Sequence, residues 1–144
     1  MKFEVKTFES LTKEELYEIL RLRAEIFIIE QNCVCLDPDG ADYNCLHVFC
    51  KENGRVIAYS RIYDKVGEPE TAKLGRVVNM YHGKGLGRKL MEKSIEVIKS
   101  RNYKKVYIEA QKYAEGFYEK FGFKTVSDEF MLDDIPHIKM ELNL

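Results

Sequence analysis

The densest group of residues that could do chemistry is the run from Tyr81 to Lys89, Tyr-His-Gly-Lys-Gly-Leu-Gly-Arg-Lys. Three glycines lie within five residues, and glycines at this density let neighbouring backbone N–H groups point toward one place. The run precedes a segment with helical periodicity, and the start of a helix adds the positive end of its dipole. Because Lys84, Arg88 and Lys89 add positive side chains, the run indicates a site for a diphosphate group.

The spacing of these glycines separates several kinds of phosphate site. Gly83, Gly85 and Gly87 follow the order Gly-x-Gly-x-Gly. A Walker A loop requires Gly-x-x-x-x-Gly-Lys-Ser/Thr and a dinucleotide fingerprint requires Gly-x-Gly-x-x-Gly, so neither is present. The Gly-x-x-Gly of a KH domain is also missing. Taken alone, the loop leaves open a glycine-rich turn whose lysines are simply solvated.

A second motif follows one predicted strand later, from Ala114 to Phe123, and reads Ala-Glu-Gly-Phe-Tyr-Glu-Lys-Phe-Gly-Phe. With it, the sequence resembles the GNAT superfamily of acetyl-CoA-dependent N-acyltransferases. The glycine loop of that superfamily reads Gln/Arg-x-x-Gly-x-Gly/Ala, and its later helix reads Ala-x-x-Phe/Leu-Tyr-x-Lys-x-Gly-Phe. Here His82 stands where the loop motif has Gln or Arg. Residues 21–32 and 135–138 are similar to the ElaA-like branch, so the resemblance covers nearly the whole chain.

The resemblance implies the fold, the reaction and many of the site residues. The expected fold is α/β (α+β), a GNAT-like mixed, mostly antiparallel sheet with a splayed central strand pair and helices on both faces. The expected reaction is direct transfer of an acetyl group from acetyl-CoA to a primary amine, with Tyr118 as general acid at the departing thiolate. The alternative for Tyr118 is a core aromatic. Residues expected to bind the cosubstrate are Val77, Val78, His82, Gly83, Lys84, Gly85, Leu86, Gly87, Arg88, Lys89 and Gln111.

The sequence leaves open which group removes a proton from the acceptor. An amine with a pKa of about 10 is protonated near neutrality and must lose that proton before it attacks. Glu109 shares a strand face with Tyr107 and Gln111. Glu30 and His137 lie in the two branch-specific motifs that should flank the acceptor cleft. Each of Glu109, His137 and Glu30 is a candidate base or a structural residue, and a chain of water molecules is a further alternative.

Two other classes of function compete with acyl transfer. One is a regulatory module that binds CoA or acyl-CoA without catalysis. The other is nucleic-acid binding through the basic segment 84–105, a pattern more typical of a solvated helix face. We therefore expect a small-molecule or peptide amine as the acceptor and no nucleic-acid or membrane partner. The sequence does not decide between a monomer and a homodimer.

Four cysteines, Cys33, Cys35, Cys45 and Cys50, fall within one short stretch. Cys-x-Cys is a poorer start for a zinc site than Cys-x-x-Cys. A reducing compartment also makes disulfides uncommon. We therefore expect reduced thiols that are mostly buried, and no metal.

Periodicity predicts the elements that must position these motifs. Thr12 and Glu15 form a capping-box pattern that opens a first helix, and further helices are predicted from about Leu86 to Asn102 and over 114–121. The first helix carries Leu16, Ile19, Leu20, Arg23 and Phe27 on one side. The segment 31–44 is predicted to be a loop. Strands are predicted over 2–8, 46–51, 55–63, 71–78, 105–110, 123–126 and 137–142, with an Asn-Gly hairpin between the second and the third.

Length and composition set the outer limits. The chain has 144 residues, which matches one domain of about 100–200 residues, so we expect a single domain over 1–144. Hydrophobic residues make up 45% and charged residues 33%, the balance of a globular protein. Apolar runs are too short to span a bilayer, and the first residues lack the hydrophobic stretch of a signal peptide. The expected location is cytoplasmic.

A net charge of −1 conceals segregated charge. Residues 82–105 carry a net charge of +6, residues 24–50 carry −5, and residues 125–138 carry −4. In a GNAT-like fold, the basic segment would lie at the cosubstrate phosphates and the acidic segments around the acceptor mouth. The resulting hypothesis is a cationic acceptor that is steered by this field.

Overall fold

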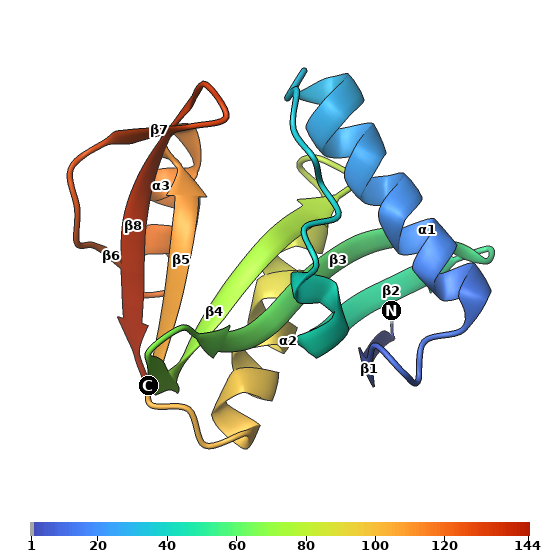
Figure 1. Ribbon diagram of the computed structural model, residues 1–144, viewed down its shortest axis with the longest axis horizontal. Coiled ribbons are helices and arrows are strands. Elements are labelled where there is room, and N and C mark those ends of the chain that lie inside the picture. Colours follow the sequence, from blue (N-terminus) through green and yellow to red (C-terminus); the bar gives the residue numbers. More distant parts are fainter. Residues whose placement is uncertain (1) are drawn as a thin grey trace.

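The computed structural model describes residues 2–144 and contains one β-sheet (Figure 1). Its strand order is β1-β2-β3-β4-β5-β8-β6, and β7 pairs with β8. All neighbouring strands are antiparallel except β4 and β5, which confirms the predicted mostly antiparallel sheet. The strands are β1 (Phe3–Thr7), β2 (Leu46–Glu52), β3 (Arg55–Lys65), β4 (Glu68–Asn79), β5 (Lys105–Gln111), β6 (Lys124–Thr125), β7 (Phe130–Leu132) and β8 (Ile135–Asn143).

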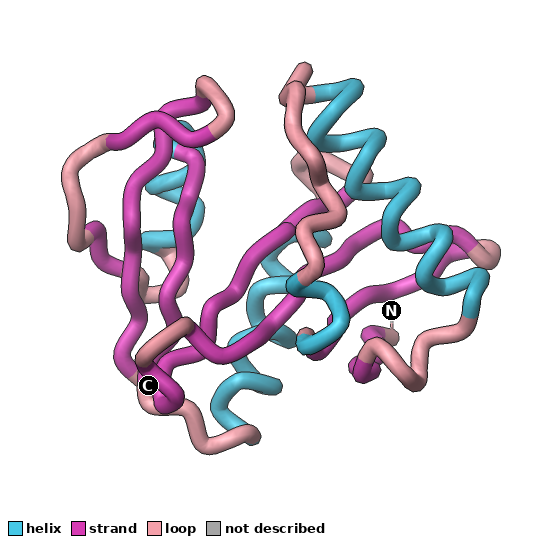
Figure 2. Tube along the Cα trace, viewed as in Figure 1, coloured by secondary structure: helices cyan, strands magenta, loops and turns pink. Residues whose placement is uncertain are grey.

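The parallel pair β4–β5 separates after a short stretch. Residues 71–73 of β4 pair with residues 105–107 of β5, and the described residues show no pairing between the two strands beyond that point. Because β4 continues to Asn79 and β5 to Gln111, the strands diverge like the arms of a V (Figures 1 and 2). The splayed central pair is therefore confirmed, and one edge of β4 is left without a strand neighbour.

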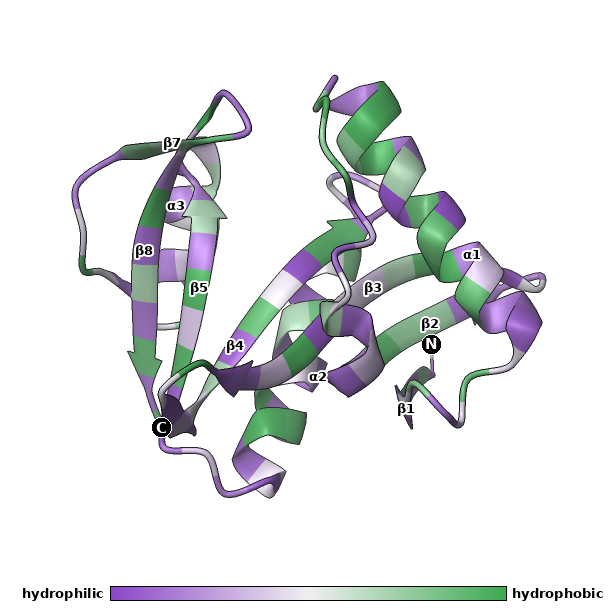
Figure 3. Ribbon diagram, viewed as in Figure 1, coloured by the Kyte–Doolittle hydropathy of each residue, from purple (hydrophilic) through white to green (hydrophobic). Residues whose placement is uncertain are grey.

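A β-bulge lies in the diverging part of β4. Tyr59 of β3 pairs with Val78, whereas Arg61 pairs with Gly75, so β4 has one more residue than β3 over this stretch. Arg76 in the bulge has φ +50°. A left-handed conformation costs a non-glycine residue about 1–2 kcal/mol, and bulges commonly re-aim side chains near functional sites. From Thr71 to Leu74 hydrophilic and hydrophobic residues alternate along β4, and the alternation stops at the bulge (Figure 3).

Helices α1 (Lys13–Ala24) and α2 (Leu86–Ser100) cover opposite faces of the sheet (Figure 1). The predicted capping box opens α1: the Glu15 N–H donates to Thr12 Oγ1 at 3.0 Å, and the Thr12 N–H donates to Glu15 Oε1 at 3.0 Å. A π-helical segment, η1 (Glu25–Glu30), extends α1. Ile19, Leu22, Arg23 and Ile26 lie on the buried side of α1 and η1. The predicted face was therefore correct for Ile19 and Arg23 but omitted Leu22 and Ile26.

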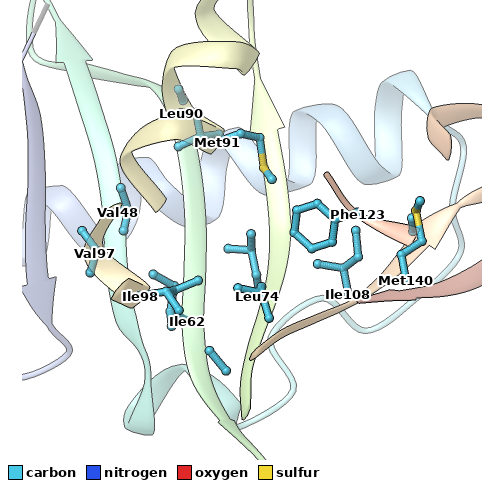
Figure 4. Close-up of a cluster of buried hydrophobic side chains, with 14 of the residues drawn as sticks. Val48, Ile62, Leu74, Leu90, Met91, Val97, Ile98, Ile108, Phe123 and Met140 are labelled. Carbon is cyan, nitrogen blue, oxygen red and sulfur yellow. The ribbon is translucent and has the colours of Figure 1, made fainter. Parts of the chain in front are cut away.

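The larger core lies on the α2 side and continues across the splay (Figure 4). Leu90, Met91 and Ile98 of α2 are fully buried against the sheet. The same cluster reaches β5, β8 and the residue directly before β6 through Ile108, Met140 and Phe123. The cluster therefore joins the two arms of the V on the α2 side. Each fully buried aliphatic side chain in it contributes about 1.5–3 kcal/mol to the stability of the fold.

Three short elements complete the chain. The helix predicted over 114–121 begins and ends two residues earlier and consists of a 3₁₀ turn, η3 (Lys112–Ala114), followed by α3 (Glu115–Glu119). A second 3₁₀ turn, η2 (Ala41–Asn44), ends the predicted loop. The sequence analysis missed β7, because its hairpin to β8 turns through Asp133 and Asp134, with φ +51° and +60°, and lacks the usual Asn-Gly pair. Among the described residues, no helix combines the length and the apolar character needed to cross a membrane.

Candidate active site

The diverging strands open onto a cleft of about 380 Å³. Its walls come from β3, β4 and β5, the segment after η1, the η3–α3 region and the β7–β8 hairpin. Apolar, acidic, basic and thiol side chains all contribute to its surface. Residues that line it include Cys33, Cys35, Leu36, Glu109, Gln111, Tyr113, Tyr118, Leu132, Asp133 and His137.

Tyr118 lies on α3 and lines this cleft. Its ring makes edge-on contacts with Phe117 and Phe123, at centroid distances of 5.2 and 6.0 Å. Burial raises the pKa of Tyr118 above its ordinary value. The phenol therefore holds its proton at neutral pH, as a general acid must before it donates. Because the side chain is both packed in aromatic contacts and open to the cleft, the core role and the catalytic role are compatible.

Two of the three candidate bases lie in the same cleft. Glu109 accepts a hydrogen bond from the Tyr107 hydroxyl at 2.8 Å, and its other oxygen is 3.6 Å from Lys73 Nζ. His137 is buried, and its Nδ1 lies 2.7 Å from the Ile135 carbonyl oxygen. Since a carbonyl can only accept, Nδ1 carries the proton, which leaves Nε2 of the neutral ring as an acceptor.

Glu30, the third candidate base, lies elsewhere. Its Oε1 is 2.9 Å from Nε2 of His82, and both side chains are largely exposed. Neither residue is among the described residues that line the cleft. The contact joins η1 to the glycine loop, so the structure places Glu30 beside a predicted cosubstrate residue and away from Glu109 and His137.

Gln111 and the two valines of β4 occupy different positions. Gln111 Nε2 donates to Gln31 Oε1 at 2.9 Å, which connects β5 to the segment after η1 across the mouth of the cleft. Val77 lines the cleft. Val78 is buried in the core beneath α1, so only its backbone, and not its side chain, remains a candidate for contact with a cosubstrate.

The glycine loop lies between the end of β4 and the start of α2. Gly83 and Gly85 have φ of +74° and +76°, values that favour glycine, and Gly85 is the N-cap of α2. Gly87 is needed for a different reason: a Cβ there would lie 3.1 Å from Asn79 Nδ2 and 3.6 Å from the Phe117 ring. Leu86 is buried beneath the loop.

The charged side chains of this loop lie at the surface. Lys84 Nζ lies 5.6 Å from the centre of the Tyr81 ring, and Arg88 pairs with Glu92 at 2.9 Å. Lys89 follows in the first turn of α2 and is exposed. Free N–H groups at a helix start, together with these cations, form an arrangement that suits an anionic group.

Comparison with known proteins assigns the family. A family model described as "Acetyltransferase (GNAT) domain" matches residues 39–144. Protein ElaA of Escherichia coli is 36% identical to this chain over an alignment that covers 90% of this chain and 88% of ElaA. The chain belongs to the GNAT acetyltransferase family. It is therefore an acyltransferase, and the predicted similarity to the ElaA-like branch is confirmed.

Solved structures of GNAT relatives have the same fold. An acyl-CoA N-acyltransferase from Pseudomonas aeruginosa is 34% identical, covers 98% of this chain and 99% of its own, and superposes with a TM-score of 0.90. The crystal structure of Escherichia coli ElaA also gives a TM-score of 0.90, at 32% identity and 97% coverage of both chains. A UPF0039 protein of Schizosaccharomyces pombe is 36% identical over 100% of this chain and 98% of its own.

One wall of this GNAT cleft is held by an arginine–aspartate network that the sequence analysis did not predict. Arg23 of α1 is fully buried, donates from Nε to Asp37 at 2.9 Å and from a terminal nitrogen to Asp42 at 2.8 Å. Arg61 of β3 donates to Asp39 at 2.7 and 2.8 Å and to Asp42 at 3.0 Å. These contacts fix the segment between η1 and η2 against α1 and β3.

Arg76 extends the network to the β4 bulge. Its Nε donates to Asp37 Oδ1 at 2.8 Å, and its terminal nitrogen donates to the Asp37 carbonyl at 3.0 Å. Burial would raise the pKa of Asp42, but its bonds to Arg23 and Arg61 outweigh burial and lower it. The strained φ of Arg76 is thus accompanied by ion pairing to Asp37, in the segment between η1 and η2.

The network corrects one part of the charge hypothesis, the part that rests on the acidic segment 24–50. Asp37, Asp39 and Asp42 supply three of the five negative charges in segment 24–50, and all three are paired with arginines. Of the remaining two, Glu25 pairs with Arg21, and Glu30 contacts His82. This segment therefore contributes little uncompensated field at the acceptor mouth. Arg23 within an apolar helix face and Arg61 within an apolar strand were the available signals, because buried arginines require acidic partners.

Proposed function

We propose that the chain transfers an acetyl group from acetyl-CoA to a primary amine on a small molecule or peptide. The observation that carries this proposal is the position of Tyr118, a half-buried phenol that lines the cleft where β4 and β5 diverge. Around it, the wall residues supply an acceptor nitrogen on His137 and the carboxylate of Glu109. Acid and base therefore lie in one cavity, as proton transfer at both ends of an acyl transfer requires.

The residues present suit an acyl-CoA cosubstrate. Residues 74–79 of β4 have an edge without a β5 partner, which offers backbone groups to an extended amide-containing arm. Residues 83–89 offer N–H groups and cations to a diphosphate. The backbone N–H of Val77 or Val78 polarises the thioester carbonyl. His82 holds the glycine loop in place through its contact with Glu30 and does not bind the phosphates directly.

The proton transfers can be assigned to this chain's residues. His137 Nε2 takes the proton from the ammonium, directly or through one water, because its Nδ1 is already committed to the Ile135 carbonyl. Glu109 is the weaker candidate, since its carboxylate already accepts from Tyr107 and lies near Lys73. The amine nitrogen then bonds to the acyl carbon, the carbon–sulfur bond breaks, and Tyr118 gives its proton to the departing thiolate. The second proton, which the nitrogen loses as the amide forms, passes through water to the Tyr118 phenolate and restores the acid.

Short-range contacts are expected to select the acceptor. The paired aspartates remove most of the field expected from segment 24–50, and Leu36 and Leu132, 81% and 40% exposed, line opposite walls of the cleft. Exposed apolar side chains beside a polar site favour a ligand with both kinds of surface. We therefore assign as acceptor a primary amine that is attached to a partly apolar group.

The test combines thiol release from acetyl-CoA over a panel of amines with CoA binding. Tyr118→Phe should lower kcat by about 10²–10⁴-fold, the usual contribution of a general acid, and leave the Kd for CoA within about twofold. Tyr113→Phe is the matched control, because Tyr113 also lines the cleft but is 78% exposed. Wild-type turnover by Tyr118→Phe would remove the acid role. CoA binding without turnover of any amine would favour the regulatory module.

A further inference from the structure

Three potential metal ligands meet at the mouth of the cleft. Cys33 Sγ, Cys35 Sγ and a carboxylate oxygen of Asp133 all lie within 4.8 Å of one another. The cysteines belong to the segment after η1, and Asp133 belongs to the turn of the β7–β8 hairpin. All three residues line the cleft, so the cluster brings together its two opposite walls.

We propose that Cys33, Cys35 and Asp133 form a binding site for Zn²⁺, with a fourth coordination position open to the cleft. Tetrahedral zinc has ligands at about 2.3 Å for sulfur and about 2.0–2.2 Å for a carboxylate oxygen, which places ligand atoms about 3.6–3.8 Å apart. The three atoms here need to move by only about 1 Å to reach that spacing. Two thiolates and one carboxylate are a donor set that suits zinc better than magnesium or calcium.

The backbone holds these ligands in place. The Cys33 N–H donates to the Phe27 carbonyl at 2.9 Å, at the end of the π-helical segment. Asp133 has φ +51° within a tight turn that the Leu132–Ile135 pair closes. A site whose ligands are positioned before binding loses less conformational entropy when the ion arrives.

The sequence could not indicate this site, because Asp133 follows Cys35 by 98 residues. The other two cysteines belong elsewhere: Cys50 is buried in the core, and Cys45 Sγ donates to the Ala41 carbonyl at 3.1 Å. A bound ion would link the two walls of the cleft and restrict access of the acceptor. That consequence rests on the proposed function, whereas ion binding does not.

The experiment measures binding of Zn²⁺ alone to the reduced full-length chain, by competition with a chromophoric chelator, and of Co²⁺ alone by its thiolate charge-transfer absorption. We expect one ion per chain. Cys35→Ser and Asp133→Asn should each weaken zinc binding by at least about tenfold, because the loss of even an outer-shell partner costs about 10–100-fold. Asp134→Asn, in the same turn, is the matched control and should bind like the wild type.

Several results would overturn the site: no stoichiometric binding, no thiolate absorption with Co²⁺, or binding that both variants leave unchanged. Thermal denaturation of each variant without metal shows whether the fold is intact. In an acyl-transfer assay, Zn²⁺ should raise the KM for the amine in the wild type but not in Asp133→Asn. Zinc binding without acyl transfer would refute the proposed function and leave the metal site standing.

Discussion

Replacement of Arg23 by Met should destabilise the protein far more than its small change in volume implies. Arg23 is fully buried and bonds both Asp37 and Asp42, which are themselves 4% and 8% exposed. Breaking a buried pair leaves a charge without compensation and typically costs about 3–5 kcal/mol. Since Asp37 keeps Arg76 and Asp42 keeps Arg61, we expect the lower end, about 3 kcal/mol.

Urea and thermal denaturation measure this cost. For a chain of this size, each kcal/mol lowers Tm by about 3 °C, so Arg23→Met should lower it by about 9 °C. Arg21→Met is the matched control: Arg21 is on the same helix and also bonds two carboxylates, Glu18 and Glu25, but lies near the surface. Exposed pairs contribute about 1 kcal/mol or less. Equal costs for the two variants would refute the view that the network is a buried, coupled unit.

Two further expectations concern the chain after α3 and the charge at the cleft. Gly122 has φ +97°, and a Cβ there would lie 3.2 Å from Leu142, so Gly122→Ala should cost about 1–2 kcal/mol in urea denaturation. Gly116→Ala meets no neighbouring atom and should cost nothing; equal losses would contradict the argument. From about 0.05 M to about 0.3 M salt, the KM for acetyl-CoA should rise while that for the amine stays within about twofold. A parallel rise in both would restore the steering hypothesis.

Local features of the structure were predictable from the sequence. The capping box of Thr12 and Glu15, the glycine loop and the first and last residues of most strands depend on residues close together in the chain. The splay was expected from the family resemblance, and the short pairing of β4 with β5 confirms it. Periodicity placed Arg23 on the inner side of the first helix, where it is fully buried.

Contacts between distant residues were not predictable from spacing. Arg76 bonds Asp37 across 39 residues, and Gln111 bonds Gln31 across 80. Periodicity shows which side chains face inward but not which partner each one meets, so the same aspartates that gave an acidic segment proved to be paired. Glu30 illustrates the same limit: its motif suggested a place at the acceptor, whereas its partner is His82 of the glycine loop.

The two arms of the V are connected very differently at their two ends. Toward the closed end they share strand pairing and a continuous core from Leu74 to Ile108 and Met140 (Figure 4). At the mouth, the described contacts between the arms include the Gln31–Gln111 hydrogen bond at 2.9 Å, and a typical hydrogen bond contributes only about 0.5–1.5 kcal/mol. Because the arginine network holds the first wall to α1 and β3, opening of the mouth should occur mainly by movement of the β7–β8 hairpin. An ion held by Cys33, Cys35 and Asp133 would oppose that movement directly.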